Sequence, residues 1–84
     1  AKPFLDLDAT FARYPGGRVE VTVELANRGP REVVSSTAEV TCGERSWHVD
    51  LGALDVDEVR VESRRLPRHE PCEAYRIQLE RATW

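Results

Sequence analysis

The chain has 84 residues, of which 40% are hydrophobic and 32% are charged, and its net charge is −3. A chain of this length forms one domain and buries only about 60 to 65% of the surface that its unfolded form exposes. This composition excludes a disordered chain. We therefore expect a single domain over residues 1–84. No apolar run reaches the roughly 18 residues that a membrane-spanning helix needs, so we expect no membrane insertion.

The charges are unevenly spread along the chain. Residues 1–58 carry 6 basic and 11 acidic side chains, whereas residues 59–84 carry 6 basic and 4 acidic ones. Nucleic-acid-binding domains usually cluster lysine and arginine with aromatic residues between them. Here the arginines alternate with glutamates, so we expect solvated faces and no nucleic-acid partner.

Apolar and polar residues alternate with a period of two in six segments, which is typical of half-buried antiparallel strands. The clearest is RVEVTVELAN, in which Val19, Val21, Val23 and Leu25 share one face. In chain order, the predicted strands cover residues 4–12, 18–27, 36–42, 46–51, 58–63 and 75–80. Segments rich in turn-forming residues separate them, so the sequence predicts an all-β sandwich or small barrel.

Residues 51–58, LGALDVDE, are ambiguous, because their leucines also fit a short helical turn. We interpret them as a crossing loop with Leu54 anchored in the core. The residues predicted to form the core are Leu7, Phe11, Val21, Val23, Val40, Trp47, Val49, Leu54, Val59, Val61, Tyr75, Ile77 and Leu79.

The order of these segments resembles the CARDB-type immunoglobulin-like (Ig-like) modules over roughly residues 17–82. The resemblance lies in RVEVTVELANRGP, the tight turn at CGE, the leucine-marked LGALDVDE, the strand EVRVES and the tyrosine-bearing CEAYRIQL. It implies an antiparallel sandwich that serves as a spacer, an adhesion module or an appendage to an enzyme. These modules have seven strands and share no set of functional residues. Here the last strand is missing or shortened near Trp84, which leaves a possible open edge and a homodimer by sheet extension.

The two cysteines are the first candidate site. In an Ig-like sandwich the third and sixth strands pair, which places Cys42 at the end of one beside Cys72 at the start of the other. We therefore predict a disulfide, worth about 3 to 4 kcal/mol in the chain-entropy model. Cys72 is out of step with the inward Tyr75, and Pro71 supplies the irregular backbone that the bond needs.

Two alternatives stay open: free thiols, or a tetrahedral zinc site formed by Cys42, His48, His69 and Cys72. Their spacing, Cys-x5-His and His-x2-Cys, differs from the paired cysteines of zinc knuckles. The strand alternation also puts His48 on the face opposite to that of Cys42's inward neighbours.

Three further sets of polar residues are interpreted as solvent-exposed side chains. Ser46, His48 and Asp50 share a strand face, as a nucleophile, base and orienting acid would, but no oxyanion hole is evident. The carboxylates of Asp6, Asp8, Asp55, Asp57 and Glu58 lack the glycine-bearing pattern of calcium loops. Arg60 and Arg64 are predicted to lie on an outward face with Glu58 and Glu62.

We expect no catalytic residues, no metal and no cofactor. The predicted function is that of a non-catalytic structural or protein-interaction module of a surface or secreted protein, with Arg64, Arg65, Arg68 and His69 as a possible contact patch for a protein partner. An accessory domain of an enzyme and a small Cys/His zinc protein are the alternatives. Eleven arginines against one lysine, with no methionine, also suit a thermophile, in which an intracellular disulfide is possible.

Overall fold

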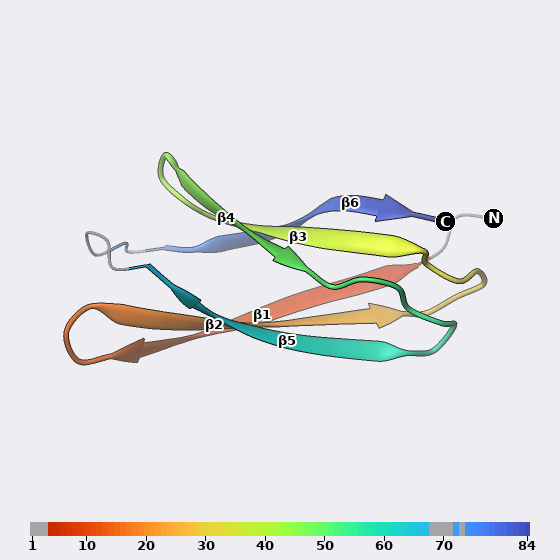
Figure 1. Cartoon of the computed structure of the whole chain (residues 1–84), viewed down its shortest axis with the longest axis horizontal. Helices are drawn as coiled ribbons and strands as arrows, with labels where there is room; N and C mark the ends of the chain where they lie inside the picture. The colour runs from red at the N-terminus through yellow and green to blue at the C-terminus, as the bar shows by residue number, and fades with distance from the viewer. Residues whose placement is uncertain (1–3, 68–71, 73) are drawn as a thin grey trace.

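The computed structural model describes residues 4–67, 72 and 74–84 of the chain. The strands in these residues form two antiparallel sheets, stacked as two layers (Figure 1). In chain order they are β1 (Leu5–Tyr14), β2 (Arg18–Asn27), β3 (Ser35–Cys42), β4 (Arg45–Asp50), β5 (Val59–Leu66) and β6 (Arg76–Thr83). The predicted all-β class and the six predicted strands are confirmed, although β5 and β6 run further than their alternation indicated. Within the described residues, no helix is long and apolar enough to cross a membrane.

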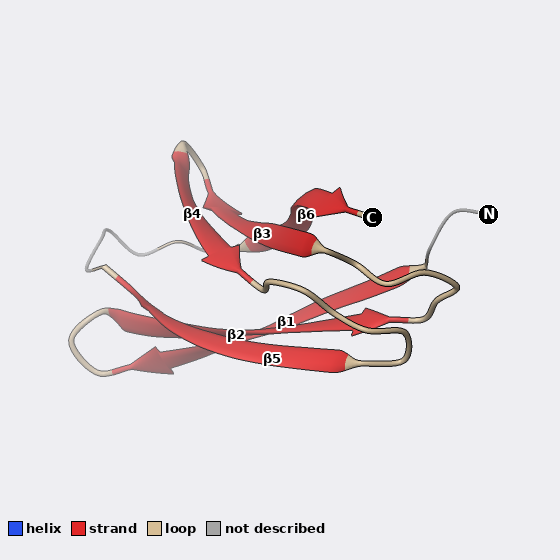
Figure 2. Ribbon diagram, turned by 45° about the vertical axis from the view of Figure 1, so that its right-hand side comes forward, coloured by secondary structure: helices blue, strands red, loops and turns tan. Residues whose placement is uncertain are grey.

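One sheet has the strand order β1-β2-β5 and the other has the order β4-β3-β6. β1 and β2 form a hairpin in which Tyr14 lies opposite Arg18. Its loop contains Gly16 and Gly17 with φ of 87° and 79°, angles that side chains with a Cβ adopt only at a cost. The connections β2–β3, β4–β5 and β5–β6 pass from one layer to the other, and β4 turns away from the lower layer near its hairpin with β3 (Figure 2).

The core lies between the two central strands. The inward residues of β2 and β3 are almost inaccessible to solvent, because both flanking strands and the opposite sheet cover them. Of the predicted core residues, Val21, Val23, Val40, Val49 and Leu54 are fully buried. The other inward residues on the sheet edges are half-buried and pack against this cluster; they are Leu7, Phe11, Trp47, Tyr75, Ile77 and Leu79.

The prediction that Val59 and Val61 belong to the core is wrong. Their exposed fractions are 49% and 54%, because the register of β5 against β2 points them to the outer face of the sheet. Arg60, Glu62 and Arg64 instead lie opposite Leu25, Val23 and Val21, on the interior face. An edge strand tolerates this arrangement because the aliphatic stems of long side chains cover apolar atoms while their charged groups reach water.

The crossing segment between β4 and β5 is anchored as predicted. Leu54 is fully buried, and its backbone exchanges two hydrogen bonds with Val33, at 2.8 and 2.9 Å. The buried Asn27 side chain holds the same region together. Its Nδ2 donates to the carbonyl oxygens of Arg31 (2.8 Å) and Leu54 (3.3 Å), and its Oδ1 accepts from the Gly29 N–H at 3.0 Å.

Candidate functional site

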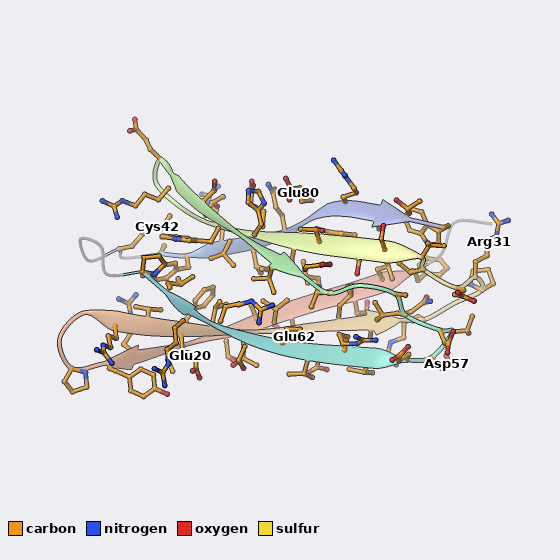
Figure 3. All side chains as sticks on the ribbon, in the orientation of Figure 1. Glu20, Arg31, Cys42, Asp57, Glu62 and Glu80 are labelled. Atoms are coloured by element: carbon orange, nitrogen blue, oxygen red, sulfur yellow. A yellow bond between two sulfur atoms is a disulfide. The ribbon has the colours of Figure 1, made fainter. Side chains whose placement is uncertain are left out.

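Cys42 and Cys72 form a disulfide, as predicted, with their Cα atoms 6.2 Å apart. Cys42 is the last residue of β3, at the left-hand end of the upper sheet in Figure 3. The expectation that Cys72 begins the sixth strand is wrong, since β6 starts only at Arg76. Arg13 Nη2 donates to the Cys72 carbonyl oxygen at 2.9 Å, so β1 also holds Cys72.

The disulfide leaves neither cysteine as the thiolate that a Cys/His zinc site requires. His48 lies on the outer face of its sheet, where its Nδ1 contacts Glu80. His69, the fourth member of the predicted zinc set, lies outside the described residues. The structure therefore shows the disulfide and places His48 in a different group of side chains.

Several of the other polar residues named above lie in turns or in ion pairs at the surface. Asp50 Oδ1 accepts from the Gly52 N–H at 3.0 Å, in the turn after β4. Asp6 pairs with Arg28 at 2.9 Å. In the turn before β5, the Glu58 carboxylate accepts from the Asp55 N–H at 2.8 Å. This hydrogen bond, together with the neighbouring Arg60 guanidinium, lowers the pKa of Glu58 below its ordinary value of 4.5.

The arginine residues of β5 do not form one outward patch. Arg60 and Arg64 lie on the interior face of the strand, which corrects the prediction that they face outward. Arg65 lies on the outer face, where it lines an open pocket of about 700 Å³ at the β1–β2 hairpin together with Tyr14, Arg18 and Glu20. Arg68 and His69 lie outside the described residues, so the structure describes only Arg64 and Arg65 of the predicted contact patch.

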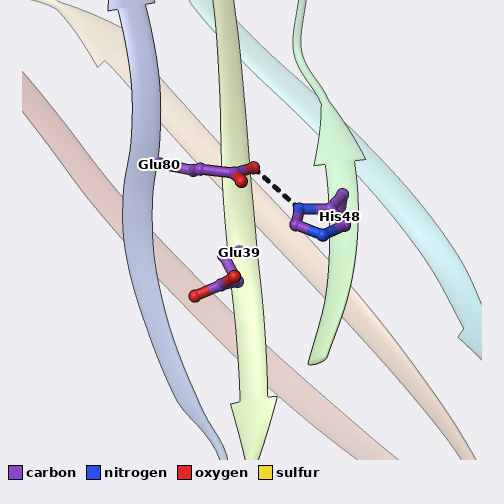
Figure 4. Close-up of side chains that lie close together, drawn as sticks. All are labelled: Glu39, His48 and Glu80. Carbon is purple, nitrogen blue, oxygen red and sulfur yellow. Dashed lines mark hydrogen bonds and ion pairs between the residues drawn. The ribbon is translucent and has the colours of Figure 1, made fainter. Parts of the chain in front are cut away.

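A cluster on the outer face of β4-β3-β6 was missed by the sequence reasoning. Glu39 of β3, His48 of β4 and Glu80 of β6 each offer a ligand atom within 4.8 Å of the other two (Figure 4). His48 Nδ1 donates to Glu80 Oε2 at 2.7 Å across the width of β3. Gln78 Nε2 donates to Glu39 Oε1, also at 2.7 Å. Strand alternation predicts an outward face for each residue, but only the strand order and register bring them together.

The two open sides of the sandwich differ in chemistry. On the side where β4 and β5 meet, Arg60 Nη2 donates to the Ala53 carbonyl oxygen (2.9 Å) and contacts Glu58 (3.2 Å). Arg64 lies 3.7 Å from Glu62, which is labelled on β5 in Figure 3. This side is therefore bordered by ion-paired side chains that reach solvent.

On the opposite side, where β1 and β6 meet, the border is apolar. Half-buried residues of β1, namely Leu5, Leu7, Ala9 and Phe11, face half-buried residues of the other layer, namely Tyr75 just before β6 and Ile77 and Leu79 on β6. Phe11 and Tyr75 stack with ring centroids 4.8 Å apart, and Arg13 lies 5.5 Å from the Tyr75 ring. We call this border the β1–β6 seam.

Comparisons with protein-family models, with curated proteins and with solved structures found no match to this chain.

Proposed function

We propose that the chain is a non-catalytic, Ig-like structural and protein-interaction module of a surface or secreted protein, and that it binds a second copy of itself along β6. Strand order supports the Ig-like assignment. Strands 1, 2 and 5 share one sheet and strands 3 and 6 share the other, with the fourth beside the third. In an Ig-like sandwich this order leaves the place beside β6 for a further strand.

The observation that carries the interaction proposal is the difference between the two open sides. Charged side chains of β5 and the half-buried Trp47 of β4 border the β4–β5 side, whereas a row of apolar, half-buried side chains borders the β1–β6 seam. Covering such apolar surface is favourable by about 25 cal/mol per Å². β6 also ends its sheet, so one row of its backbone N–H and C=O groups has no neighbouring strand in the described sheet. An added strand would satisfy these groups and cover the seam at once.

A second copy fits this edge because the sequence of β6 is self-complementary. In an antiparallel pairing centred on Gln78, Ile77 of each copy lies opposite Leu79 of the other. The same pairing puts Arg76 of each copy opposite Glu80 of the other, and opposite charges at such positions are favourable. Self-pairing of β1 centred on Leu7 would instead oppose Asp6 and Asp8, which is unfavourable.

The contact is expected to be weak. β6 is regular only up to Leu79, because a β-bulge shifts its register against β3 between Thr37 and Ala38. A pairing of about five residues, with the apolar rows beside it, buries less than the roughly 1,600 Å² of a standard interface. Such a contact serves best where copies are held at high local concentration, as on a surface. The disulfide supports an oxidising compartment of this kind.

Sedimentation equilibrium over a range of protein concentrations tests this proposal. We expect the mean molar mass to rise towards that of a dimer as concentration increases, with a dissociation constant on the order of 100 µM. The substitution R76E puts like charges opposite each other twice and should weaken association at least about tenfold. R18E makes the same charge change on β2 of the other sheet and should leave association unchanged. A chain that stays monomeric at every concentration, or equal effects of R76E and R18E, would overturn the proposal.

A further inference from the structure

The outer face of β4-β3-β6 carries the strongest unexplained group of side chains in the described structure. Glu39, His48 and Glu80 come from three adjacent strands and converge above the central one (Figure 4). Glu39 and His48 are direct cross-strand partners. Glu80 is the extra residue at the β-bulge, since Leu79 pairs with Ala38 and Arg81 pairs with Thr37. From there its carboxylate reaches over β3 to His48.

The charges of this group are not balanced within it. Two carboxylates approach one imidazole, and among the described side chains neither carboxylate is paired with an arginine or lysine. His48 and Glu80 have exposed side-chain fractions of 53% and 40%, so an ion from solvent has direct access. Like charges brought together on one sheet face are unfavourable unless a cation lies between them.

We propose that Glu39, His48 and Glu80 bind a zinc ion on this face. Zinc takes imidazole nitrogen and carboxylate oxygen ligands at about 2.0 to 2.2 Å, so tetrahedral ligand atoms lie about 3.3 to 3.5 Å apart. The three ligand atoms lie within 4.8 Å of one another, so side-chain rotations would bring Glu39 nearer and open the 2.7 Å contact between His48 Nδ1 and Glu80 Oε2. Zinc takes the place of the proton that Nδ1 shares with Glu80, and water fills the fourth position.

Neighbouring residues orient the side chains that would bind zinc. Gln78 Nε2 donates to Glu39 Oε1 at 2.7 Å, which orients that carboxylate as outer hydrogen bonds orient the ligands of known metal sites. Glu39 and His48 are paired with each other in the β3–β4 ladder, and Glu80 lies between Leu79 and Arg81, which are both paired with β3. This site is separate from the Cys/His set that the sequence suggested, with which it shares only His48.

The test is isothermal titration of chelator-treated, disulfide-intact protein with zinc chloride. We expect one zinc per chain, and each of H48Q, E39Q and E80Q should weaken binding at least about tenfold. Two matched controls should leave affinity within about twofold. H69Q removes the other imidazole, and E24Q removes one member of Asp8 and Glu24, a carboxylate pair that faces outward on the other sheet without a histidine.

A second readout separates the site from a general loss of fold. Zinc should shift the ring signals of His48 in the NMR spectrum of the wild-type chain, while those of His69 stay in place. R76E, which weakens self-association, should keep full zinc affinity, so the two proposals fail independently. The absence of zinc binding, equal weakening by H48Q and H69Q, or ring shifts at His69 alone would overturn the proposal.

Discussion

Val23 and Glu62 lie directly opposite each other on β2 and β5, so a fully buried valine shares the interior face of its sheet with a carboxylate. Val61, the residue directly before Glu62, points outward and is 54% exposed. The register of β5 thus places its valines outside and its charged residues inside. This relationship explains why the β4–β5 side of the sandwich has a charged border.

The register predicts different losses of stability when valine is replaced by threonine at two positions, Val61 and Val23. V61T should change the free energy of unfolding by less than about 0.5 kcal/mol, because the side chain is exposed and remains β-branched. V23T buries a hydroxyl group in the core and should cost about 2 to 3 kcal/mol. Urea unfolding of the two variants measures both values. If V61T were the more costly one, the valine face of β5 would be the inner face.

The alternation of EVRVES shows that the two faces of β5 differ, but not which face is inward. In β2 and β3, which are central strands, the apolar face is buried, and the prediction there was correct. In β5, the turn before the strand sets the register, through hydrogen bonds from Asp57 N–H to Asn27 C=O (2.7 Å) and from Asn27 N–H to Glu58 C=O (2.9 Å). Leu66 is buried at the other end of β5. These long-range constraints outweigh the apolar face of an edge strand, and no local pattern reveals them.

Of the two candidate sites, one could be predicted from the sequence and the other could not. The disulfide was predictable because the order of strands brings Cys42 and Cys72 together at one end of a sheet. The Glu39–His48–Glu80 cluster was not, since His48 and Glu80 lie on strands separated by β3 and meet only through the bulge at Glu80.

Reduction of the disulfide should destabilise the fold markedly. Cys42 and Cys72 are separated by 30 positions, and a bond closing a loop of this size contributes about 3 to 4 kcal/mol in the chain-entropy model. Denaturant unfolding with and without reductant measures the difference. The double variant C42A/C72A should match the reduced protein, and reductant should have no effect on it. Equal stability of the oxidised and reduced chains would contradict this prediction.

Asn27 should be among the costliest polar residues to replace. Its side chain is fully buried and makes three hydrogen bonds that hold the β2–β3 and β4–β5 connections. N27A removes all three hydrogen bonds, although the Leu54 carbonyl oxygen keeps the one from the Val33 N–H, and should cost about 2 to 4 kcal/mol. N27D keeps the acceptor for Gly29 but loses both donors. T10A, on the outer face of β1, serves as a control that should stay within about 0.5 kcal/mol of the wild type.

Glu58 should contribute to acid sensitivity. The Asp55 N–H and, after it, the Arg60 guanidinium hold the pKa of Glu58 below 4.5, against an opposing effect of desolvation. A carboxyl group with a depressed pKa stabilises the folded state above its unfolded pKa, and this contribution disappears as the pH falls through the folded pKa. E58Q should therefore be less stable than the wild type near neutral pH, and the difference should vanish in acid. E44Q, which changes an exposed glutamate in the β3–β4 turn in the same way, is the matched control.

The most direct test of the interaction proposal is a cysteine trap at the centre of the expected strand pairing. The proposed pairing would place Gln78 of each copy opposite Gln78 of the other, at a separation that a disulfide spans. Under mild oxidation, Q78C should form a covalent dimer at a rate that rises with protein concentration. S46C, on β4 at the other edge of the same sheet, should remain monomeric. Equal cross-linking of Q78C and S46C, or none of Q78C, would contradict self-association along β6.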